Sequence, residues 1–577
     1  MAARLTTYVV VAIVAATLIA GLIVGAQRDD SDGPVDLIVF NAKVYTADGS
    51  GKMAEAVAIR GNQILRVGSD REIGRLRRPQ TIVVDAHGAA VLPGFNDADV
   101  QFTDGALALD GVDLLGAGSI EEAQARISDW AEANPVREWV IGRGWSSQQA
   151  KGGLPTRQLL DAAVPDRPAY MLSADGRSAW LNTNALRLAG VTRRTANPDG
   201  GMIEKDPRTG EPTGVLTAAA VALASRHLPQ PTHAQRARAL QTAIAAAHEN
   251  GVTSVQDAAV TPDAFAVYEE ARLAGELNLR VYSSVGVSEQ TTAEDFGTLE
   301  SLSSKYPDDP LFKVGGARIA LDGPVESSEA ALLEASSGPT ATAGDTSIDP
   351  DALNKLVRML DARGWQVTLD AFGDRAVRMA LDAYAHAERS NPKPARGRRH
   401  RIGHVALLQP DDLPRFARLG TIALLRPYEA TPFPGRLDAW NRITGEDRAA
   451  QAWPVASISA AHGRVAFATG WPAASPNPLA AIQAAVTRSD ETAPEDPWNP
   501  AEAVTLKRAI DSFTSVPAYA SFDEQRKGSL KPGMLADLVV LSNDIFLASS
   551  SRISAAKVAV TIFDGKIVYR RSSTPTD

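Results

Sequence analysis

Apolar and polar positions alternate with two different periods along the middle of the chain. In the segment 350–364 apolar residues recur every three or four positions and the segment ends at a glycine, as in a helix with one buried face. The run 366–370 indicates a strand, and the segment 373–387 returns to helical spacing. This repeated alternation of strand and helix is typical of parallel α/β proteins. We therefore predict repeated βα units through the centre of the chain.

Both ends of the chain instead contain short strand-like runs separated by turns. Four such runs lie between residues 36 and 85, and a Gly-Asn pair separates two of them. Near the other end, residues 536–541 are strand-like, and the runs 558–563 and 566–569 flank an Asp-Gly turn that is typical of a hairpin. This pattern predicts β structure at both ends. The two ends could form two separate small units or one combined unit.

A long uncharged segment occupies the start of the chain. Residues 5–27 carry no charge, and about 20 apolar residues suffice to cross a hydrocarbon core of ~30 Å. Arg4 precedes this segment and Arg28-Asp29-Asp30 follows it, which favours a cytoplasmic N-terminus. We predict a single-pass membrane anchor and tether over residues 1–35, with the main body exported to a periplasmic or extracellular space. A cleaved signal peptide is the alternative, because Val24-Gly25-Ala26 is rich in small residues.

Composition narrows the chemistry that the chain can perform. Its 577 residues carry a net charge of −9 with scattered basic residues, which argues against a nucleic-acid partner. There is no cysteine, so disulfides, thiolate nucleophiles and cysteine-bound zinc are excluded. Only eight histidines occur. A histidine-rich metal site would have to draw its ligands from those eight.

One short stretch gives the chain a recognisable ancestry. The run Pro93-Gly94-Phe95-Asn96-Asp97-Ala98-Asp99-Val100-Gln101 follows an apolar strand. It resembles the signature Pro-Gly-Phe-x-Asp-x-His-x-His that opens the barrel of the amidohydrolase superfamily. In that superfamily the two histidines hold a catalytic metal. Here the two positions are Asp99 and Gln101, so the frame of the motif is present without its metal ligands.

Further segments resemble one branch of this superfamily. The runs 138–145, 173–182 and 198–201 are similar to amidohydrolase family 3, the branch that contains N-substituted formamide deformylases. The resemblance extends over nearly all of residues 36–572. It implies an α/β fold: a (β/α)8 TIM-like barrel with a composite β-sandwich from both chain ends and an inserted α/β roof subdomain. The implied boundaries are 36–92 plus 518–572 for the sandwich and 93–517 for the barrel, with the insertion at about 103–230.

The resemblance also locates the remaining metal positions of the family. The run 317–323 resembles Val-Lys-x-x-x-Asp-Gly, with Arg318 in the lysine position and Asp322 as the aspartate. An arginine stays protonated in proteins, so Arg318 cannot form the carbamate that bridges metals in some branches. The run 370–376 resembles His-Ala-Ile-Gly-Asp-Arg-Ala, with Asp370 replacing the histidine.

Two later motifs show the same loss of ligands. The run 399–404 resembles Arg-His-Arg-Ile-Glu-His; His404 is kept, but Gly403 replaces the glutamate. The run 467–472 resembles Phe-Gly-Ser-Asp-x-Pro, and Gly470 replaces the aspartate that serves metal-activated water as a proton shuttle. If a metal binds at all, the resemblance leaves Asp99, Asp370 and His404 as its ligands. We expect no cofactor, and a single divalent metal is the alternative.

The expected charge balance suggests what replaced the metal. Asp99, Asp322 and Asp370 are expected to converge at the barrel mouth, where buried carboxylates require a cation. We predict that the guanidinium of Arg318 forks between two of them. Alternatively, Arg318 points to solvent and the aspartates are hydrated. The remodelled site would then comprise Asp99, Gln101, Arg318, Asp322, Asp370 and His404.

Two functional hypotheses follow. The first is a membrane-anchored pseudoenzyme that binds a small-molecule ligand or a membrane-protein partner without catalysis. The second is a hydrolase of non-peptide C–N (amide) bonds with a rebuilt single-metal or metal-independent site. In the roof, Trp145 and Trp180 are candidates for a substrate-binding wall or for packing. Arg177 occupies the histidine position of the Asp-Gly-His segment that the resemblance implies, and it is a further substrate-binding candidate.

Overall fold

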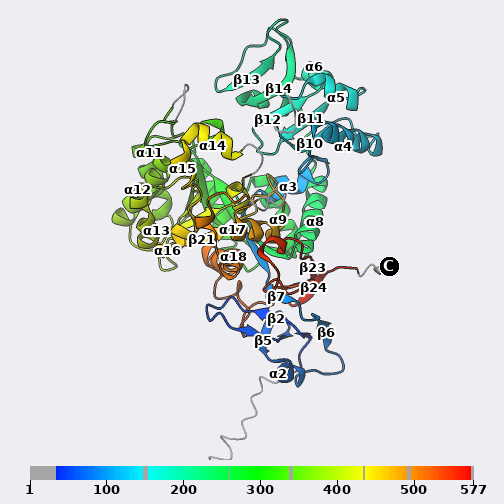
Figure 1. Cartoon of the computed structure of the whole chain (residues 1–577), viewed down its shortest axis with the longest axis vertical. Coiled ribbons are helices and arrows are strands. Elements are labelled where there is room, and N and C mark those ends of the chain that lie inside the picture. The colour runs from blue at the N-terminus through cyan, green and yellow to red at the C-terminus, as the bar shows by residue number, and fades with distance from the viewer. Residues whose placement is uncertain are drawn as a thin grey trace, which may run out of the picture.

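A parallel β-barrel lies at the centre of the computed structural model, which describes residues 34–146, 154–258, 260–336, 342–432, 436–489 and 496–572 (Figure 1). Eight parallel strands follow one another in chain order around the barrel and leave it nearly closed. They are β8 (Phe95–Val100), β15 (Val252–Asp257), β16 (Arg280–Gly286), β17 (Phe312–Ala320), β18 (Gln366–Ala371), β19 (Arg401–His404), β20 (Ile422–Leu425) and β21 (Arg464–Phe467). The predicted α/β barrel is thereby confirmed.

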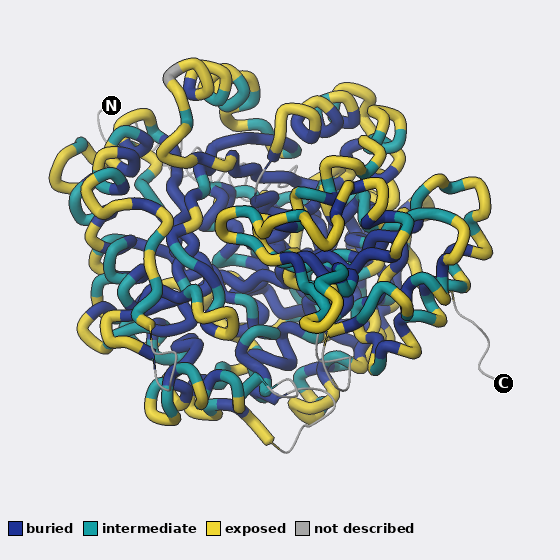
Figure 2. The backbone as a smooth tube through the Cα atoms, turned by 90° about the horizontal axis from the view of Figure 1, so that it is seen from above, coloured by how far each residue is buried: buried dark blue, intermediate teal, exposed yellow. Residues whose placement is uncertain are grey.

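Amphipathic helices cover the outside of this barrel. Helix α11 turns Leu353, Val357 and Leu360 toward the strands, as its spacing predicted, and Asp349 caps it by accepting the backbone N–H of Asp351 at 2.9 Å. The covering helices are α8 (His233–Glu249), α9 (Pro262–Leu273), α10 (Ala293–Lys305), α11 (Pro350–Ala362), α12 (Asp374–Ser390), α13 (Leu413–Leu419), α16 (Val455–Ala460), α17 (Pro478–Thr487) and α18 (Leu506–Ser512). Figure 2 shows buried backbone through the middle of the molecule, with exposed segments around it.

A short helix blocks one end of the barrel. In α19 (Ser515–Ala520) the side chain of Ala520 packs against Ala98 and Leu424 from the strands. Its backbone oxygen accepts hydrogen bonds from Arg401 at 2.7 Å and Gln366 at 2.9 Å. Both donors start their strands, so α19 lies at the amino-terminal ends. The carboxyl ends are therefore left to form the mouth, where barrel enzymes place their reacting groups.

Two packed sheets lie below the barrel, and one of them combines strands from both chain ends (Figure 1). One sheet has the order β5-β4-β1-β6 and the other β24-β23-β22-β7-β2-β3. In the second sheet Leu92 pairs with Val539, which joins the two ends of the chain directly. The strands are β1 (Leu37–Phe40), β2 (Lys43–Tyr45), β3 (Met53–Ala54), β4 (Ala56–Arg60), β5 (Gln63–Gly68), β6 (Ile82–Asp85), β7 (Ala90–Pro93), β22 (Leu538–Leu541), β23 (Val558–Phe563) and β24 (Lys566–Arg570).

The insertion between β8 and α8 forms a separate sheet at the opposite end of the molecule (Figure 1). We call this insertion the roof. Its six strands have the order β13-β14-β12-β11-β10-β9. Its elements are β9 (Val112–Asp113), α4 (Ile120–Ala133), β10 (Val140–Trp145), α5 (Arg157–Ala163), β11 (Ala169–Ser173), β12 (Ser178–Leu181), α6 (Thr183–Leu188), β13 (Gly201–Lys205), β14 (Pro212–Ala218) and α7 (Ala222–Ser225).

The predicted membrane anchor lies outside the described residues, because it occupies residues 5–27. Within the part of the chain that the structure describes, no helix has the length and apolar character needed to cross a membrane.

Candidate functional site

Arg318 joins two carboxylates at the barrel mouth. It lies near the end of β17, and its Nε donates to Asp370 Oδ2 of β18 at 2.7 Å. Its Nη2 lies 3.2 Å from Asp99 Oδ2 of β8, and its Nη1 donates to Asp99 Oδ1. All three side chains are largely buried, with 14% exposure for Arg318 against 5% for Asp99 and 12% for Asp370. The structure therefore contains the predicted fork.

A second arginine, which the sequence analysis missed, completes this cluster. Arg426 directly follows β20, and its Nη2 donates to Asp99 Oδ2 at 2.8 Å. Burial alone would raise the pKa of Asp99, but the guanidiniums of Arg318 and Arg426 hold that pKa well below its usual range. Asp99 is therefore ionised at neutral pH and forms ion pairs with both arginines. An arginine immediately after a buried barrel strand was the signal that could have identified it.

His404 lies beside the cluster in a strained backbone conformation. Its Nδ1 is 3.3 Å from Glu429 Oε2, and its ring stacks on Phe372 with centroids 3.8 Å apart. His404 and Val405 have φ values of 68° and 47°, in the left-handed region that a β-branched residue rarely adopts. Strain of this kind costs about 1–3 kcal/mol per residue and collects at functional sites. The end of β19 therefore holds His404 in a defined orientation.

Asp322 and Gln101 take no part in the hydrogen bonds that Arg318 makes to Asp99 and Asp370. The carboxylate of Asp322 accepts backbone N–H groups of Phe372 and Ala331 at 2.8 Å each and of Gly373 at 2.9 Å. Burial raises the pKa of Asp322 to about 6. Its role is thus to tie the loop after β17 to the end of β18. Gln101 is exposed and directly precedes α3 (Phe102–Ala108), and its side chain does not cap that helix.

The two roof tryptophans are core residues in this structure rather than walls of a pocket. Trp145 and Trp180 are 1% and 0% exposed, and their rings pack edge to face with centroids 6.4 Å apart. Their indole N–H groups donate to backbone oxygens, Trp145 to Met171 at 2.7 Å and Trp180 to Thr156 at 2.9 Å. The indole N–H donor of each ring therefore has its hydrogen-bond partner inside the roof. The substrate-binding role considered for them is therefore corrected to packing.

Arg177 connects the roof to the barrel mouth. It lies in the turn between β11 and β12, and its guanidinium pairs with Glu329 from the loop after β17. A cavity of about 390 Å³ lies at this contact and is lined by Arg177, Asp322, Glu329, Asp345 and Ser347. Of the three roof candidates, Arg177 alone reaches this cavity. Its predicted position at a binding site stays open to test.

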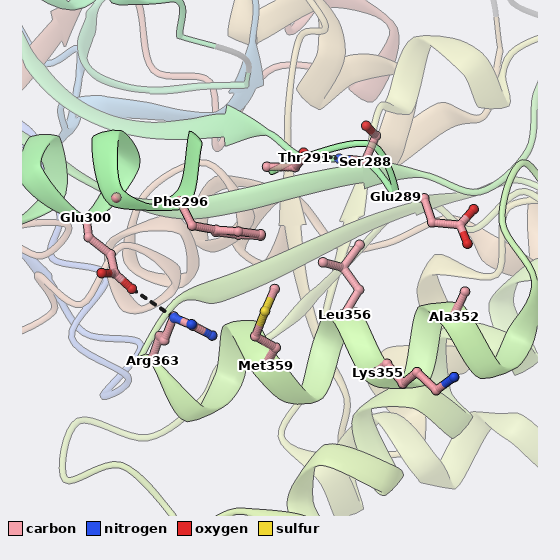
Figure 3. Close-up of a pocket in the computed structure, with 11 residues that line it drawn as sticks. Ser288, Glu289, Thr291, Phe296, Glu300, Ala352, Lys355, Leu356, Met359 and Arg363 are labelled. Atoms are coloured by element: carbon pink, nitrogen blue, oxygen red, sulfur yellow. Dashed lines mark hydrogen bonds and ion pairs between the residues drawn. The ribbon is translucent and has the colours of Figure 1, made fainter. Parts of the chain in front are cut away.

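A larger cavity of about 520 Å³ lies on the flank of the barrel, between α10 and α11 (Figure 3). Phe296, Leu356 and Met359 line it, and an ion pair of 2.9 Å between Arg363 and Glu300 closes one end. These residues belong to the outer helices. The flank cavity is thus separate from the strand ends that carry the Arg318 cluster.

The residues at the mouth do not fit a divalent metal. Both oxygens of Asp99 accept from guanidiniums, and Asp370 Oδ2 accepts from Arg318. His404 Nδ1 faces Glu429. Among the described residues no group of three or more His, Asp and Glu side chains could hold a metal ion. A catalytic zinc site needs about three protein ligands. Both oxygens of Asp99 and one oxygen of Asp370 are held by arginines, and of these carboxylate oxygens only Asp370 Oδ1 is buried without a hydrogen-bond partner among the described residues.

Comparisons with known proteins agree with the fold. The sequence profile described as the amidohydrolase family matches residues 82–569. The protein LONG AFTER FAR-RED 3 of Arabidopsis thaliana is 30% identical over 545 residues, which cover 92% of this chain and 91% of that protein. N-substituted formamide deformylase of Arthrobacter pascens is 28% identical over 549 residues, 93% and 99% of the two chains. An uncharacterized metal-dependent hydrolase from Pyrococcus horikoshii superposes with a TM-score of 0.70 at 21% identity, over 89% and 99% of the chains.

Proposed function

This chain belongs to the amidohydrolase family, and from that premise we propose that its barrel mouth binds a small molecule or a partner without metal-dependent hydrolysis. The resemblance to amidohydrolase family 3 that the motifs indicated is confirmed. The proposal departs from the hydrolase names of several relatives, so it rests on the residues of the mouth itself.

The observation that carries this proposal is the fork of Arg318. A metal ion at the mouth would need the oxygens of Asp99 and Asp370, and both carboxylates already face this guanidinium. Removing one partner from such a buried ion cluster typically costs about 3–5 kcal/mol. A metal would therefore have to displace a stable internal cation before it could bind.

The cavity of about 390 Å³ beneath the roof supplies space for a small ligand. Its volume lies within the range of about 300–1,000 Å³ that is usual for ligand pockets.

We further propose that residues 5–27 anchor the protein in a membrane and that the described body lies on its outer side. A membrane-protein partner of the barrel mouth would then share the same membrane.

The test combines metal content with activity. Protein purified without chelators or immobilised-metal columns is analysed by plasma mass spectrometry, and N-substituted formamides are supplied as probes. We expect far less than one equivalent of zinc, iron or manganese, and no hydrolysis that a chelator abolishes. One equivalent of tightly bound metal together with chelator-sensitive release of amine would overturn the proposal.

A second candidate function, metal-independent hydrolysis, is favoured by the pair of His404 and Glu429. With Nδ1 facing Glu429, the Nε2 of His404 could take a proton from a water that attacks an amide carbonyl. The guanidinium of Arg426 would stabilise the negative charge on the former carbonyl oxygen. The C–N bond then breaks, the proton on His404 passes to the leaving amine, and a carboxylic acid remains.

This candidate has its own test. Amide hydrolysis that persists in the presence of a chelator should disappear in His404→Gln and fall in Glu429→Gln. Release of amine at an unchanged rate from His404→Gln would exclude His404 as the base. The same assay therefore separates the two functions.

A further inference from the structure

Two glycines lie directly against the charged cluster, at the positions where the resemblance implies a glutamate and an aspartate. Gly403 is on β19 and pairs in register with Asp370 on β18. Gly470 follows β21 and faces Arg426. We infer that the metal centre was replaced by a matched set: Arg318 and Arg426 supply two fixed positive charges, and Gly403 and Gly470 are positioning residues that give the set its space.

A Cβ atom at residue 403 would require the Asp370 carboxylate to shift. A Cβ atom at residue 403 would lie 2.4 Å from Asp370 Oδ1 and 3.7 Å from its Cα. Gly403 sits in a regular strand, and its φ lies outside the left-handed region that favours glycine. Backbone conformation therefore does not explain this glycine. The space taken by the Asp370 carboxylate, which Arg318 holds at 2.7 Å, does explain it.

The contact at Gly470 is similar but adds a backbone requirement. A Cβ atom there would lie 2.8 Å from Arg426 Cδ, 3.0 Å from its Nε and 3.3 Å from its Cζ. Gly470 also has a φ of 72°, where any other residue is strained. A side chain at 470 would thus push Arg426 away from Asp99, to which its Nη2 now donates at 2.8 Å.

The two arginines and the two carboxylates of the cluster depend on one another. Asp99 lies between the two guanidiniums, and Asp370 holds Arg318 from its other side. Displacing either arginine would leave a buried carboxylate short of its cation, which is costly. The two glycines therefore provide the space that this cluster needs, in addition to marking the loss of the family's ligands. The inference holds whether or not the mouth hydrolyses its ligand, so it can fail independently of the proposed function.

Double-mutant cycles on melting temperature test the spatial part. We expect Gly403→Ala to lower the melting temperature by about 1–3 °C, as overpacking does in a chain of this length. The same change in an Asp370→Ala background should have less than about half that effect, because the clash is gone. Gly297→Ala is the control, since Gly297 in α10 has no atom within 4 Å of an added Cβ and a φ outside the left-handed region. Equal effects of Gly403→Ala in both backgrounds would overturn the role of Gly403.

Gly470→Ala is tested against Arg426→Ala in the same way. Gly533→Ala is its control, because Gly533 has a φ of 86° and no atom within 4 Å of an added Cβ. It measures the backbone strain without the clash. We expect Gly470→Ala to cost more than this control in the wild-type background and about the same as the control when Arg426 is absent. An equal cost of Gly470→Ala with and without Arg426 would overturn the role of Gly470.

Metal rescue tests the charge replacement. If the two guanidiniums stand in for metal ions, Arg318→Ala/Arg426→Ala should melt at a higher temperature when millimolar MnCl₂ is added, because the freed carboxylate oxygens are ligands that suit Mn²⁺. The wild type should not shift. If the double variant fails to fold, Arg426→Ala alone is tested in the same way. A wild type stabilised by Mn²⁺, or arginine variants indifferent to it, would overturn the inference.

Discussion

Arg318 and Asp370 meet across neighbouring strands of the barrel, with Arg318 Nε 2.7 Å from Asp370 Oδ2. Both side chains are more than four-fifths buried. Water therefore cannot replace either partner at low cost. Arg318 therefore supplies a permanent positive charge at a place where the family resemblance implies an exchangeable metal ion.

Replacing Arg318 should be strongly destabilising. Arg318→Ala leaves the buried carboxylates of Asp99 and Asp370 with one cation fewer, which typically costs about 3–5 kcal/mol. Denaturant unfolding at neutral pH measures the change. Arg363→Ala is a matched control, because Arg363 pairs with Glu300 at 2.9 Å but the two side chains are 43% and 49% exposed. That exposed pair should contribute no more than about 1 kcal/mol. Equal losses in the two variants would contradict the buried fork.

Stability should fall as the pH rises from about 5 to about 8. Asp97 is buried on β8, and burial raises its pKa to about 7 despite hydrogen bonds from Thr469. An unfolded aspartate has a pKa of about 3.9, so the folded protein binds this proton more tightly. The contribution is fully present below about pH 4 and is lost as the pH rises through about 7. Burial raises the pKa of Asp257 to about 7 as well, with the same sign.

Melting curves recorded at intervals across this pH range measure the dependence. Asp97→Asn should flatten the fall, because the neutral amide has no proton to lose. Asp345→Asn is the control, since the side chain of Asp345 is fully exposed. Identical slopes for the wild type and Asp97→Asn would rule out Asp97 as a source of the pH dependence.

Trp180 should behave as a core residue of the roof. Trp180→Ala removes a fully buried ring, a change that typically costs about 3–5 kcal/mol. Hydrogen exchange should show that the backbone amides of β10, β11 and β12 lose protection before those of the barrel strands do. Arg177→Ala, by contrast, should leave these strands protected, because its contact with Glu329 is partly exposed. A Trp180→Ala variant with unchanged exchange would restore the pocket-wall interpretation.

The predicted anchor makes a separate prediction. Residues 5–27 should keep the full-length protein in the membrane fraction through high-salt and alkaline washes. Protease added to the outer side should reach residues beyond 30. Soluble mature protein that begins near Gln27 would instead establish a cleaved signal peptide.

The barrel and the fork of Arg318 could be predicted because strand periodicity and motif position are local in the sequence. Once the motifs indicated which residues end the strands, the need of buried carboxylates for a cation pointed to Arg318. Arg426 was missed since it lies outside every motif. Asp322 was misplaced because its own partners are backbone N–H groups, which no side-chain pattern reveals.

The glycines show a second limit of sequence reasoning. Gly403 and Gly470 could be recognised as lost ligands, but their contacts with Asp370 and Arg426 depend on distances between strands. For Trp145 and Trp180 the sequence left packing and pocket roles open, because an aromatic residue suits both. The burial of the two rings decided between them.

The sheet that joins the two chain ends also has a consequence for biosynthesis. Val91 of β7 pairs with Val540 of β22, so this edge of β7 stays unpaired until nearly the whole chain has been made. Contacts between such distant segments form slowly, and an unpaired strand edge invites association with other chains. The pairing of β7 with β22 therefore forms late, after the C-terminal segment has been made.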